Sequence, residues 1–338
     1  MMRSWLALGL LAAAIQPARA DSVEDFYRGR TVELIVASDA ATEYTRDARL
    51  LIKYLPKYIP GTPTIILRNM PGASGINAVN HLYQLAARDG SVLGSFNKSI
   101  PMYEATHLAG VQYKSAELSW IGSMSRTNSL VVTWRGAART LQEARQRETT
   151  IGALGLSGTM AAYPFLLNRT QGTRLKVVAG YVGSAEINLA MERGEVEGRG
   201  TYSWDFFRSD HRDWRSNNPM NFLVQIGLEK EPELPDVPLL LDLAHNDTER
   251  AVYELISADS MIARPFAAPP GVPAERVAVL RQAFDRSMQD ADFRAEAEKA
   301  QATVSPVPGA RVAEIVRRIV TVPQAILDTA NDWMSPPK

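Results

Sequence analysis

The chain has 338 residues, of which 46% are hydrophobic, with 37 basic and 37 acidic side chains and no cysteine. This length predicts two domains, each large enough to bury its own core. The formal charge of zero argues against a nucleic-acid partner, which requires a basic surface. The lack of cysteine excludes disulfides, iron–sulfur clusters, thiolate zinc sites and a cysteine nucleophile.

The first twenty residues are typical of a secretory signal peptide. Arg3 precedes an apolar run, Trp5–Ile15, and Ala18 and Ala20 supply the small residues that a signal peptidase requires. As a helix this run would span only about 16 Å, which is about half of a bilayer's hydrocarbon core. We therefore expect export to the periplasm and cleavage after Ala20 rather than a permanent membrane anchor.

Beyond residue 20, short apolar runs typical of strands alternate with segments of helical spacing. The expected strands are Thr31–Ala37, Thr64–Leu67, Val92–Phe96, Leu130–Trp134, Thr150–Leu154, Leu175–Ala179 and Phe222–Ile226. The expected helices are Asp47–Lys57, 76–86, Leu141–Arg147, Met160–Arg169, Ala185–Arg193 and 277–288. This alternation predicts an α/β protein with mostly parallel sheets and ligands at the carboxyl ends of the strands.

Two segments rich in proline interrupt this alternation, Lys230–Pro238 and Pro265–Pro273. The second is predicted to be a stiff loop by which the chain returns, because proline fixes φ. We place chain crossings near residues 124 and 263. Lobe one is then predicted to comprise residues 21–124 and 263–338, and lobe two residues 125–262.

Residues for catalysis or metal binding show no recognisable spacing. The four histidines are scattered, and neither a phosphate-binding loop nor a dinucleotide-binding glycine motif is present. The segment Gly155-Leu-Ser157-Gly158 is one residue short of the G-x-S-x-G motif that holds a serine nucleophile. We therefore expect no catalytic residue, no metal and no cofactor, and we do not expect an enzyme.

Loops of small residues follow two of the expected strands, at Asn69–Gly75 (NMPGASG) and Gly155–Thr159 (GLSGT). Small residues let a ligand approach the backbone, and the helix that follows presents unpaired N–H groups. Ser74, Ser157 and Thr159 add hydroxyl groups. Either loop alone could be a tight turn with a serine or threonine cap, but the two together favour binding of a carboxylate.

Several motifs occur in a fixed order over nearly the whole mature chain. They are Asp25–Val32 (DFYRGRTV), Asn69–Gly75, Arg88–Gly90 (RDG), Trp120–Ser123 (WIGS), Tyr181–Glu195 (YVGSAEINLAMERGE), Leu234–Pro238 (LPDVP) and Arg264–Pro273 (RPFAAPPGVP). In this order they resemble the periplasmic substrate-binding receptors of tripartite tricarboxylate transporters.

This resemblance implies a type II periplasmic-binding-protein fold, in which two lobes close like a Venus flytrap on one small carboxylate. It also implies delivery of the ligand to membrane transporter subunits, and we expect the protein to be a monomer. The ligand contacts that it implies are Ala73, Ser74, Gly75, Leu156, Ser157, Thr159, Tyr181, Val182 and Gly183. Trp204 lies where related chains carry an aromatic residue, and it either walls the cleft or belongs to the core.

The loop after the first strand departs from the family's pattern, P-x-G-G-x-x-D. Here Ser38–Asp47 (SDAATEYTRD) lacks the glycines, and Thr45 stands at the usual aspartate position. We expect Ser38 and Asp39 to lie beside the ligand, and Tyr44 and Thr45 to contact its far end.

Three acidic residues in this loop, Asp39, Glu43 and Asp47, are four residues apart, so a helix would place their carboxylates on one face. We expect these carboxylates to be neutralised only if Arg46 or Arg49 turns inward. They could equally be solvated capping residues. If they face the ligand, they predict a preference for monocarboxylates, or for ligands whose far end is polar, aromatic or cationic.

Two other functions fit parts of the sequence. A receptor of this kind could pass its ligand to a sensor kinase instead of a permease. An exported serine hydrolase would use Ser157 or Ser74, but the sequence places no partner residue beside either serine.

Overall fold

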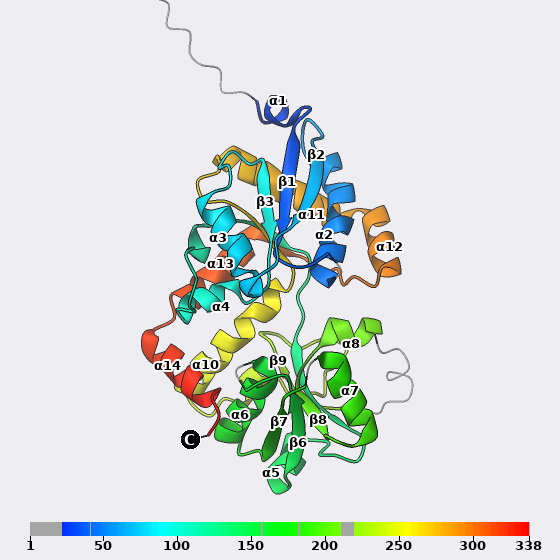
Figure 1. The fold of residues 1–338 in the computed structure, drawn as a ribbon, viewed down its shortest axis with the longest axis vertical. Coiled ribbons are helices and arrows are strands. Elements are labelled where there is room, and N and C mark those ends of the chain that lie inside the picture. Colours follow the sequence, from blue (N-terminus) through cyan, green and yellow to red (C-terminus); the bar gives the residue numbers. More distant parts are fainter. Residues whose placement is uncertain (1–21, 41, 157, 182, 211–219, 338) are drawn as a thin grey trace, which may run out of the picture.

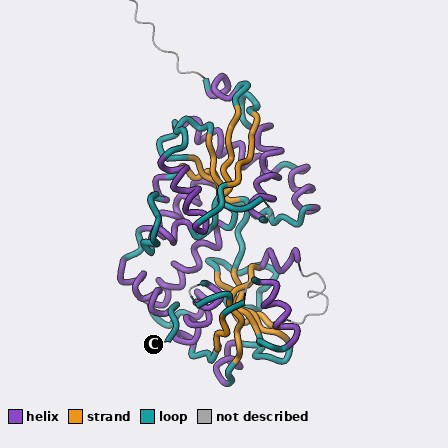
Figure 2. The backbone as a smooth tube through the Cα atoms, viewed as in Figure 1, coloured by secondary structure: helices purple, strands orange, loops and turns teal. Residues whose placement is uncertain are grey.

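A computed structural model describes residues 22–40, 42–156, 158–181, 183–210 and 220–337. It contains two α/β lobes, one above the other in Figure 1, and helices surround both sheets (Figure 2). The expected signal peptide lies outside the described residues. Within these ranges no helix has both the length and the apolar character that are needed to cross a bilayer.

The upper lobe is built on a six-stranded sheet in the order β11-β4-β10-β3-β1-β2. These strands are β1 Thr31–Val36, β2 Thr64–Asn69, β3 Val92–Ser95, β4 Ser119–Ser123, β10 Pro265–Ala268 and β11 Val307–Pro308. β1 is parallel to β2 and β3, so the carboxyl ends of these three strands meet at one edge of the sheet. β10 runs antiparallel to β3 and β4.

The lower lobe is built on a five-stranded sheet in the order β7-β6-β8-β5-β9. These strands are β5 Ser129–Trp134, β6 Thr149–Ala153, β7 Leu175–Ala179, β8 Gly198–Ser203 and β9 Met220–Ile226. β6 is parallel to β7 and β8, whereas β5 is antiparallel to β8 and β9.

The prediction of mostly parallel sheets is therefore wrong, because both sheets are mixed. The parallel strands of each sheet run toward the other lobe. β5 and β10 each begin directly after the chain has crossed between the lobes, so they enter their sheets from that side and run in the opposite direction.

The helices are α1 Val23–Tyr27, α2 Glu43–Tyr54, α3 Ile76–Gln84, α4 Ile100–Ala105, α5 Leu141–Gln146, α6 Thr159–Gln171, α7 Ser184–Arg193, α8 Trp204–Asp210, α10 Asp247–Ser257, α11 Ala274–Gln289, α12 Ala291–Lys299, α13 Gly309–Val320 and α14 Gln324–Trp333. Short 3-10 helices are η1 Leu55–Tyr58, η2 Ala73–Gly75, η3 Ser115–Glu117, η4 Leu240–Leu243 and η5 Ala258–Ile262.

All seven expected strands are present, with ends that differ by up to two residues. α2 begins four residues earlier than expected because the Thr42 hydroxyl accepts a hydrogen bond from Thr45 N (3.3 Å) and caps the helix. The segment from Pro265 was expected to be a loop, but its first four residues form β10. Proline is tolerated there because it occupies the first position of the strand.

Two chain crossings lie side by side between the sheets and are hydrogen-bonded to each other. Thr127 N donates to Ser260 O (2.8 Å), Ala263 N to Ser125 O (3.1 Å) and Met124 N to Arg264 O (2.9 Å). The limits of the two lobes near residues 124 and 263 stay predictions. The C-terminal helix α14, predicted for lobe one, contacts α6 of the lower lobe, where Asp332 pairs with Arg169 at 2.9 Å.

The core of the upper lobe depends on one aromatic side chain from α11. Phe284 is fully buried, and its ring centroid lies 5.8 Å from that of Phe266 on β10. The ring also covers Gly122 of β4, where a Cβ would lie only 2.3 Å from its Cε1 atom. The absence of a side chain at Gly122 therefore lets α11 pack closely on the sheet.

We expect the substitution Phe284→Ala to lower the free energy of unfolding by about 3–5 kcal/mol, because it removes a large buried ring and leaves a cavity. Urea denaturation followed by circular dichroism measures this change. Gln282→Ala, at an exposed position of the same helix, is the control and should change stability by less than about 0.5 kcal/mol. A similar small effect of Phe284→Ala would contradict this account of the core.

Candidate functional site

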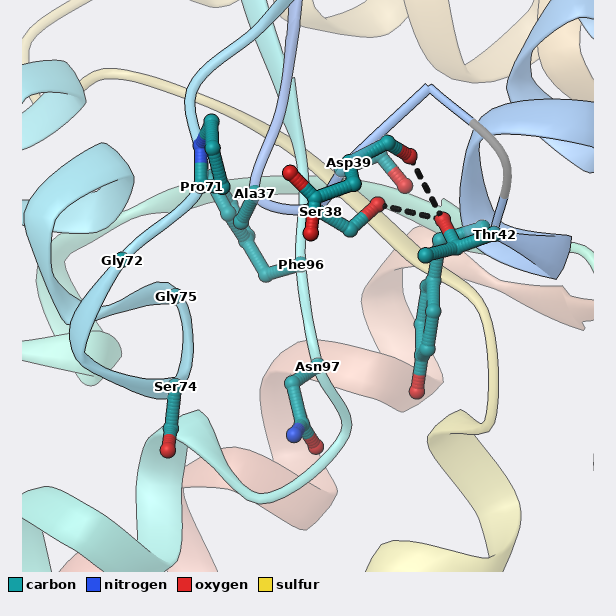
Figure 3. Close-up of a pocket in the computed structure, with 12 residues that line it drawn as sticks. Ala37, Ser38, Asp39, Thr42, Pro71, Gly72, Ser74, Gly75, Phe96 and Asn97 are labelled. Atoms are coloured by element: carbon teal, nitrogen blue, oxygen red, sulfur yellow. Dashed lines mark hydrogen bonds between the residues drawn. The ribbon is translucent and has the colours of Figure 1, made fainter. Parts of the chain in front are cut away.

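A cavity of about 300 Å³ opens at the carboxyl ends of β2, β1 and β3. Its walls are the three loops that follow these strands, which Figure 3 shows converging. The lining includes Ala37, Ser38, Asp39, Tyr44, Gly72, Ser74, Gly75, Phe96 and Asn97. In open α/β sheets this edge is where ligands bind.

The loop after β2 has an unusual backbone conformation. Gly72, Ala73, Ser74 and Gly75 all have positive φ angles, of 119°, 46°, 54° and 93°. A Cβ at Gly75 would lie 3.2 Å from the Cβ of Ala37, so glycine lets this loop approach the loop after β1. Strained backbone of this kind is retained where it positions functional groups. Here it presents the Ser74 hydroxyl, which points to the same side as the Asn97 amide (Figure 3).

The side chain of Thr45 fixes the loop after β1 through hydrogen bonds. Its hydroxyl donates to Asp39 O (2.8 Å) and accepts from Asn69 Nδ2 (2.7 Å), which also donates to Ser38 O (2.8 Å). Thr45 is fully buried and lines neither of the two cavities described here. The structure thus gives the Thr45 side chain a role in positioning the loop, and its contact with the ligand stays a prediction.

The acidic residues of this segment are neutralised by an arginine from a distant part of the chain. Arg264, at the end of the return crossing, pairs through Nη2 with Glu43 (2.8 Å) and through Nε with Asp47 (3.0 Å). Arg46 does pair with Asp47 (3.0 Å), but the expectation that only Arg46 or Arg49 could neutralise these carboxylates is wrong, because Arg264 also does so. Asp39 precedes α2 and is exposed, so it does not share a helical face with the other two.

Burial around Arg264 changes the acidity of its neighbours. Burial raises the pKa of Glu43. The positive charge of Arg264 lowers this pKa, and the negative charges of Asp205 and Asp47 raise it further. The guanidinium also lies over the ring of Tyr44, 4.5 Å from the centroid, and burial raises the pKa of Tyr44 to about 12. Arg264 thus binds acidic and aromatic groups of α2 beside Asp205 of the lower lobe.

A second, larger cavity of about 680 Å³ lies between the lobes and adjoins the first, since Tyr44 and Asn97 line both. The upper lobe contributes Glu43, Lys98, Ser99, Met102 and Tyr103. The lower lobe contributes Ser129, Thr159, Tyr163, Ser184, Arg199 and Tyr202. A site with walls from both sheets can bind a ligand in one arrangement of the lobes better than in another.

The structure brings together only part of the predicted site. Ser38, Asp39, Ser74 and Gly75 line the smaller cavity, Tyr44 lines both, and Thr159 lines the larger one. Ala73, Leu156, Tyr181 and Gly183 line neither cavity; Leu156 is 49% exposed, and Tyr181 packs against the core of the lower lobe. Ser157 and Val182 lie outside the described residues.

Trp204 belongs to the core rather than to the wall of the cleft. Its side chain is 6% exposed, stacks on Phe207 with centroids 5.6 Å apart, and meets Phe222 edge-on at 6.0 Å. It lines neither cavity. The alternative of a buried core tryptophan is the correct one.

Sequence reasoning missed several residues of the cavities, notably Asn97, Lys98, Tyr103, Tyr163 and Arg199. Asn97 and Lys98 directly follow the expected strand 92–96, which the structure places beside β1, so its carboxyl end was a usable signal. The two tyrosines and Arg199 carried no such signal. Among the described residues there is no group of three or more histidine, aspartate or glutamate side chains that could hold a metal.

No protein-family model and no curated protein matches the sequence. The structure is similar to a TctC solute-binding protein from Polaromonas, with a TM-score of 0.72, 18% identity, and coverage of 90% of this chain and 99% of that one. It is similar to the periplasmic binding protein BugD, with a TM-score of 0.59, 14% identity, and coverage of 92% and 100%. MatC from Rhodopseudomonas palustris, solved with bound malate, has a TM-score of 0.56, 19% identity, and coverage of 90% and 99%.

These similarities extend over both lobes and establish the fold. The chain has the two-lobed α/β fold of these solute-binding proteins, as the motifs of the sequence predicted. The neighbours named here are binding proteins, and none is described as an enzyme.

We expect Arg264→Leu to lower the free energy of unfolding by about 3–5 kcal/mol near pH 7, because it removes the buried cation that Glu43 and Asp47 share and leaves Asp47 with only the exposed Arg46. The variant also loses the charge that lowers the pKa of Glu43. As the pH falls through that raised pKa, Glu43 takes up a proton in the folded state and the destabilisation decreases.

Urea denaturation at about pH 7 and about pH 5 tests both the size and the direction of this effect. Arg49→Leu serves as the control, since Arg49 is exposed on the same helix and, within the part of the chain that the structure describes, donates only to Ala40 O. An Arg264→Leu variant as stable as the control at both pH values would show that these ion pairs do not hold α2.

Proposed function

We propose that the protein is a periplasmic solute-binding receptor that captures a small organic carboxylate and delivers it to the membrane subunits of a tripartite tricarboxylate transporter. The observation that carries this proposal is the cavity between the lobes, which reaches the carboxyl ends of β2, β1 and β3. Two proteins of similar fold from R. palustris were solved with malate and with adipate, both carboxylates. The secretory features of residues 1–20 support export to the periplasm, with cleavage after Ala20.

In this proposal the upper lobe supplies neutral hydrogen-bond donors to the ligand. The Ser74 hydroxyl and the Asn97 amide lie at the rim of the smaller cavity, and α3 begins directly behind the glycine loop with no side-chain cap. Uncapped N–H groups at a helix start can donate hydrogen bonds to a ligand oxygen. Ser38 and Gly75 complete this side of the site.

The lobes are proposed to close on the ligand about the two crossings. Their mutual hydrogen bonds keep the crossings together, while the larger cavity between the lobes has walls from both sheets. A ligand that contacts both walls binds the closed arrangement better and shifts the population toward it.

The other functions have less support. Transfer of the ligand to a sensor kinase would use the same cavity, and no feature of the structure favours it over transport. A hydrolase would need a base beside its serine, but His81, His107 and His245, the histidines within the described residues, line neither cavity. The monomeric state stays a prediction.

We expect a thermal-shift screen of the purified protein to show stabilisation by small carboxylates. A ligand at about 100 times its dissociation constant stabilises the folded protein by about 2.7 kcal/mol. Asn97→Asp should weaken binding of any such carboxylate, because it adds a negative charge to the wall that the two cavities share and like charges repel.

Asn97→Asp is a mild change for the fold, because the carboxylate can still accept the hydrogen bond that Asn97 Oδ1 accepts from Ser99 N (2.9 Å). Gln282→Glu, which adds the same charge on the outer helix α11, is the matched control and should not alter binding. Equal affinity of the Asn97→Asp variant and the control would place the ligand elsewhere.

Closure makes a separate prediction for small-angle X-ray scattering. The radius of gyration should fall when a carboxylate identified in the screen is added at saturation, because the lobes approach each other. Addition of the corresponding neutral amide should leave the radius unchanged. An unchanged radius with the bound carboxylate would rule out closure as part of the function.

A further inference from the structure

One cation in the cavity between the lobes differs from the others in its partners. Lys98 pairs with Asp259 (3.1 Å), and Arg264 pairs with Glu43 and Asp47. Arg199 of β8 also lines this cavity and is only 4% exposed. Yet no carboxylate among the described residues forms an ion pair with it.

The guanidinium of Arg199 is instead held by neutral groups. Nε donates to Thr201 O (3.0 Å), Nη1 to Asn188 Oδ1 (2.6 Å) and Nη2 to Ser184 Oγ (3.2 Å). Its face lies over the ring of Tyr202, 4.4 Å from the centroid. These contacts use three of the five N–H groups of the side chain and fix its plane, so two N–H groups have no acceptor among the described residues and can serve a ligand.

The surroundings of Arg199 are also positive rather than negative. Ser184 is the first residue of α7, and Thr159, which lines the same cavity, is the first residue of α6; neither helix has a side-chain cap. The N-terminal N–H groups of both helices therefore add positive potential to that of Arg199. Burial lowers the pKa of Arg199 to about 10, so the side chain keeps its charge at neutral pH.

A buried cation without an anion is costly for a protein, unless a ligand supplies the missing charge. We infer that Arg199 is the anchor for the ligand's carboxylate, on the lower lobe, and that the ligand is an aromatic monocarboxylate. This inference rests on the proposed receptor function and adds to it the class of ligand and the residue that selects it.

The single charge follows from the pairing of the other cations. Because Lys98 and Arg264 are already neutralised, one uncompensated positive charge remains among the described residues of the cavity, and a second ligand carboxylate would meet Glu43 or Asp259. The aromatic body of the ligand follows from the walls of the rest of the cavity. Tyr44, Met102, Tyr103 and Tyr163 line them, and stacked or edge-on rings pack well there.

Isothermal titration of the purified protein tests the ligand class with benzoate, 4-hydroxybenzoate and phenylacetate. At least one of these should bind, and its neutral amide, such as benzamide for benzoate, should bind on the order of 30-fold more weakly or not measurably. Terephthalate, which adds a second carboxylate to the same ring, should bind about tenfold more weakly. Failure of all three monocarboxylates to bind at millimolar concentration, or tighter binding of terephthalate, would overturn the inference.

Variants of Arg199 test the anchor. Arg199→Gln should weaken binding of the monocarboxylate on the order of 30-fold or more and remove the preference over its amide. Arg199→Lys should retain part of that preference, because the charge stays while the planar fork is lost. Arg193→Gln, which removes an exposed arginine of α7 outside both cavities, is the control and should bind as the unaltered protein does.

The preference for acid over amide separates this role from a structural one, since a damaged fold would weaken both ligands together. If Arg199→Gln does not fold, as judged by circular dichroism, Ser184→Ala carries the test: it frees one N–H group of the anchor and should alter the affinity for acid more than that for amide. Unchanged preference in Arg199→Gln, or in Ser184→Ala where that variant carries the test, would overturn the inference. If the protein binds adipate or malate but no aromatic monocarboxylate, the inference about the ligand class fails and the proposed function stands. If it binds no carboxylate at all, the proposed function fails as well.

Discussion

The ion pairs of Arg264 with Glu43 and Asp47 are the constraint on which the geometry of the site depends. Arg264 ends the return crossing, and its backbone carbonyl accepts from Met124 N of the other crossing (2.9 Å), so one residue joins both crossings to α2. The position of α2 sets the preceding loop through the Thr42 cap and the Thr45 hydroxyl. A buried pair of this kind contributes less through its own attraction than through the penalty for any arrangement that separates its charges. It therefore favours one geometry of the first loop and the crossings over others.

This pairing also decides which charges in the cavity are available to a ligand. The first loop appears acidic in the sequence, but Arg264 neutralises Glu43 and Asp47, and Asp259 neutralises Lys98. What remains is Arg199, buried in the lower lobe among neutral hydrogen-bond acceptors. The proposed preference for a single carboxylate therefore rests on a different physical cause. It follows from one cation without an ion pair among the described residues, rather than from a row of repelling acids.

The two sides of the cavity contribute different physical properties. On the upper lobe, backbone strain in Gly72–Gly75 and the ends of three parallel strands present hydroxyl, amide and N–H groups without formal charge. On the lower lobe, the starts of α6 and α7 and the guanidinium of Arg199 create positive potential. Because the lining comes from both lobes, a ligand that contacts both would favour the proposed closure.

The sequence by itself determined the α/β class, all seven expected strands, the order of the family's motifs and the loop Asn69–Gly75, because hydrophobic period and glycine content act over short distances. It also selected Ser74 and Tyr44, which the structure places in the lining of a cavity. Only the tertiary structure decided that Thr45 and Trp204 are buried, that both sheets are mixed, and that Arg264 meets Glu43 across more than two hundred residues of chain. Arg199 belongs to the same group. Whether an arginine is solvated, paired or buried alone depends on what the fold places around it, and no local pattern of residues carries that information.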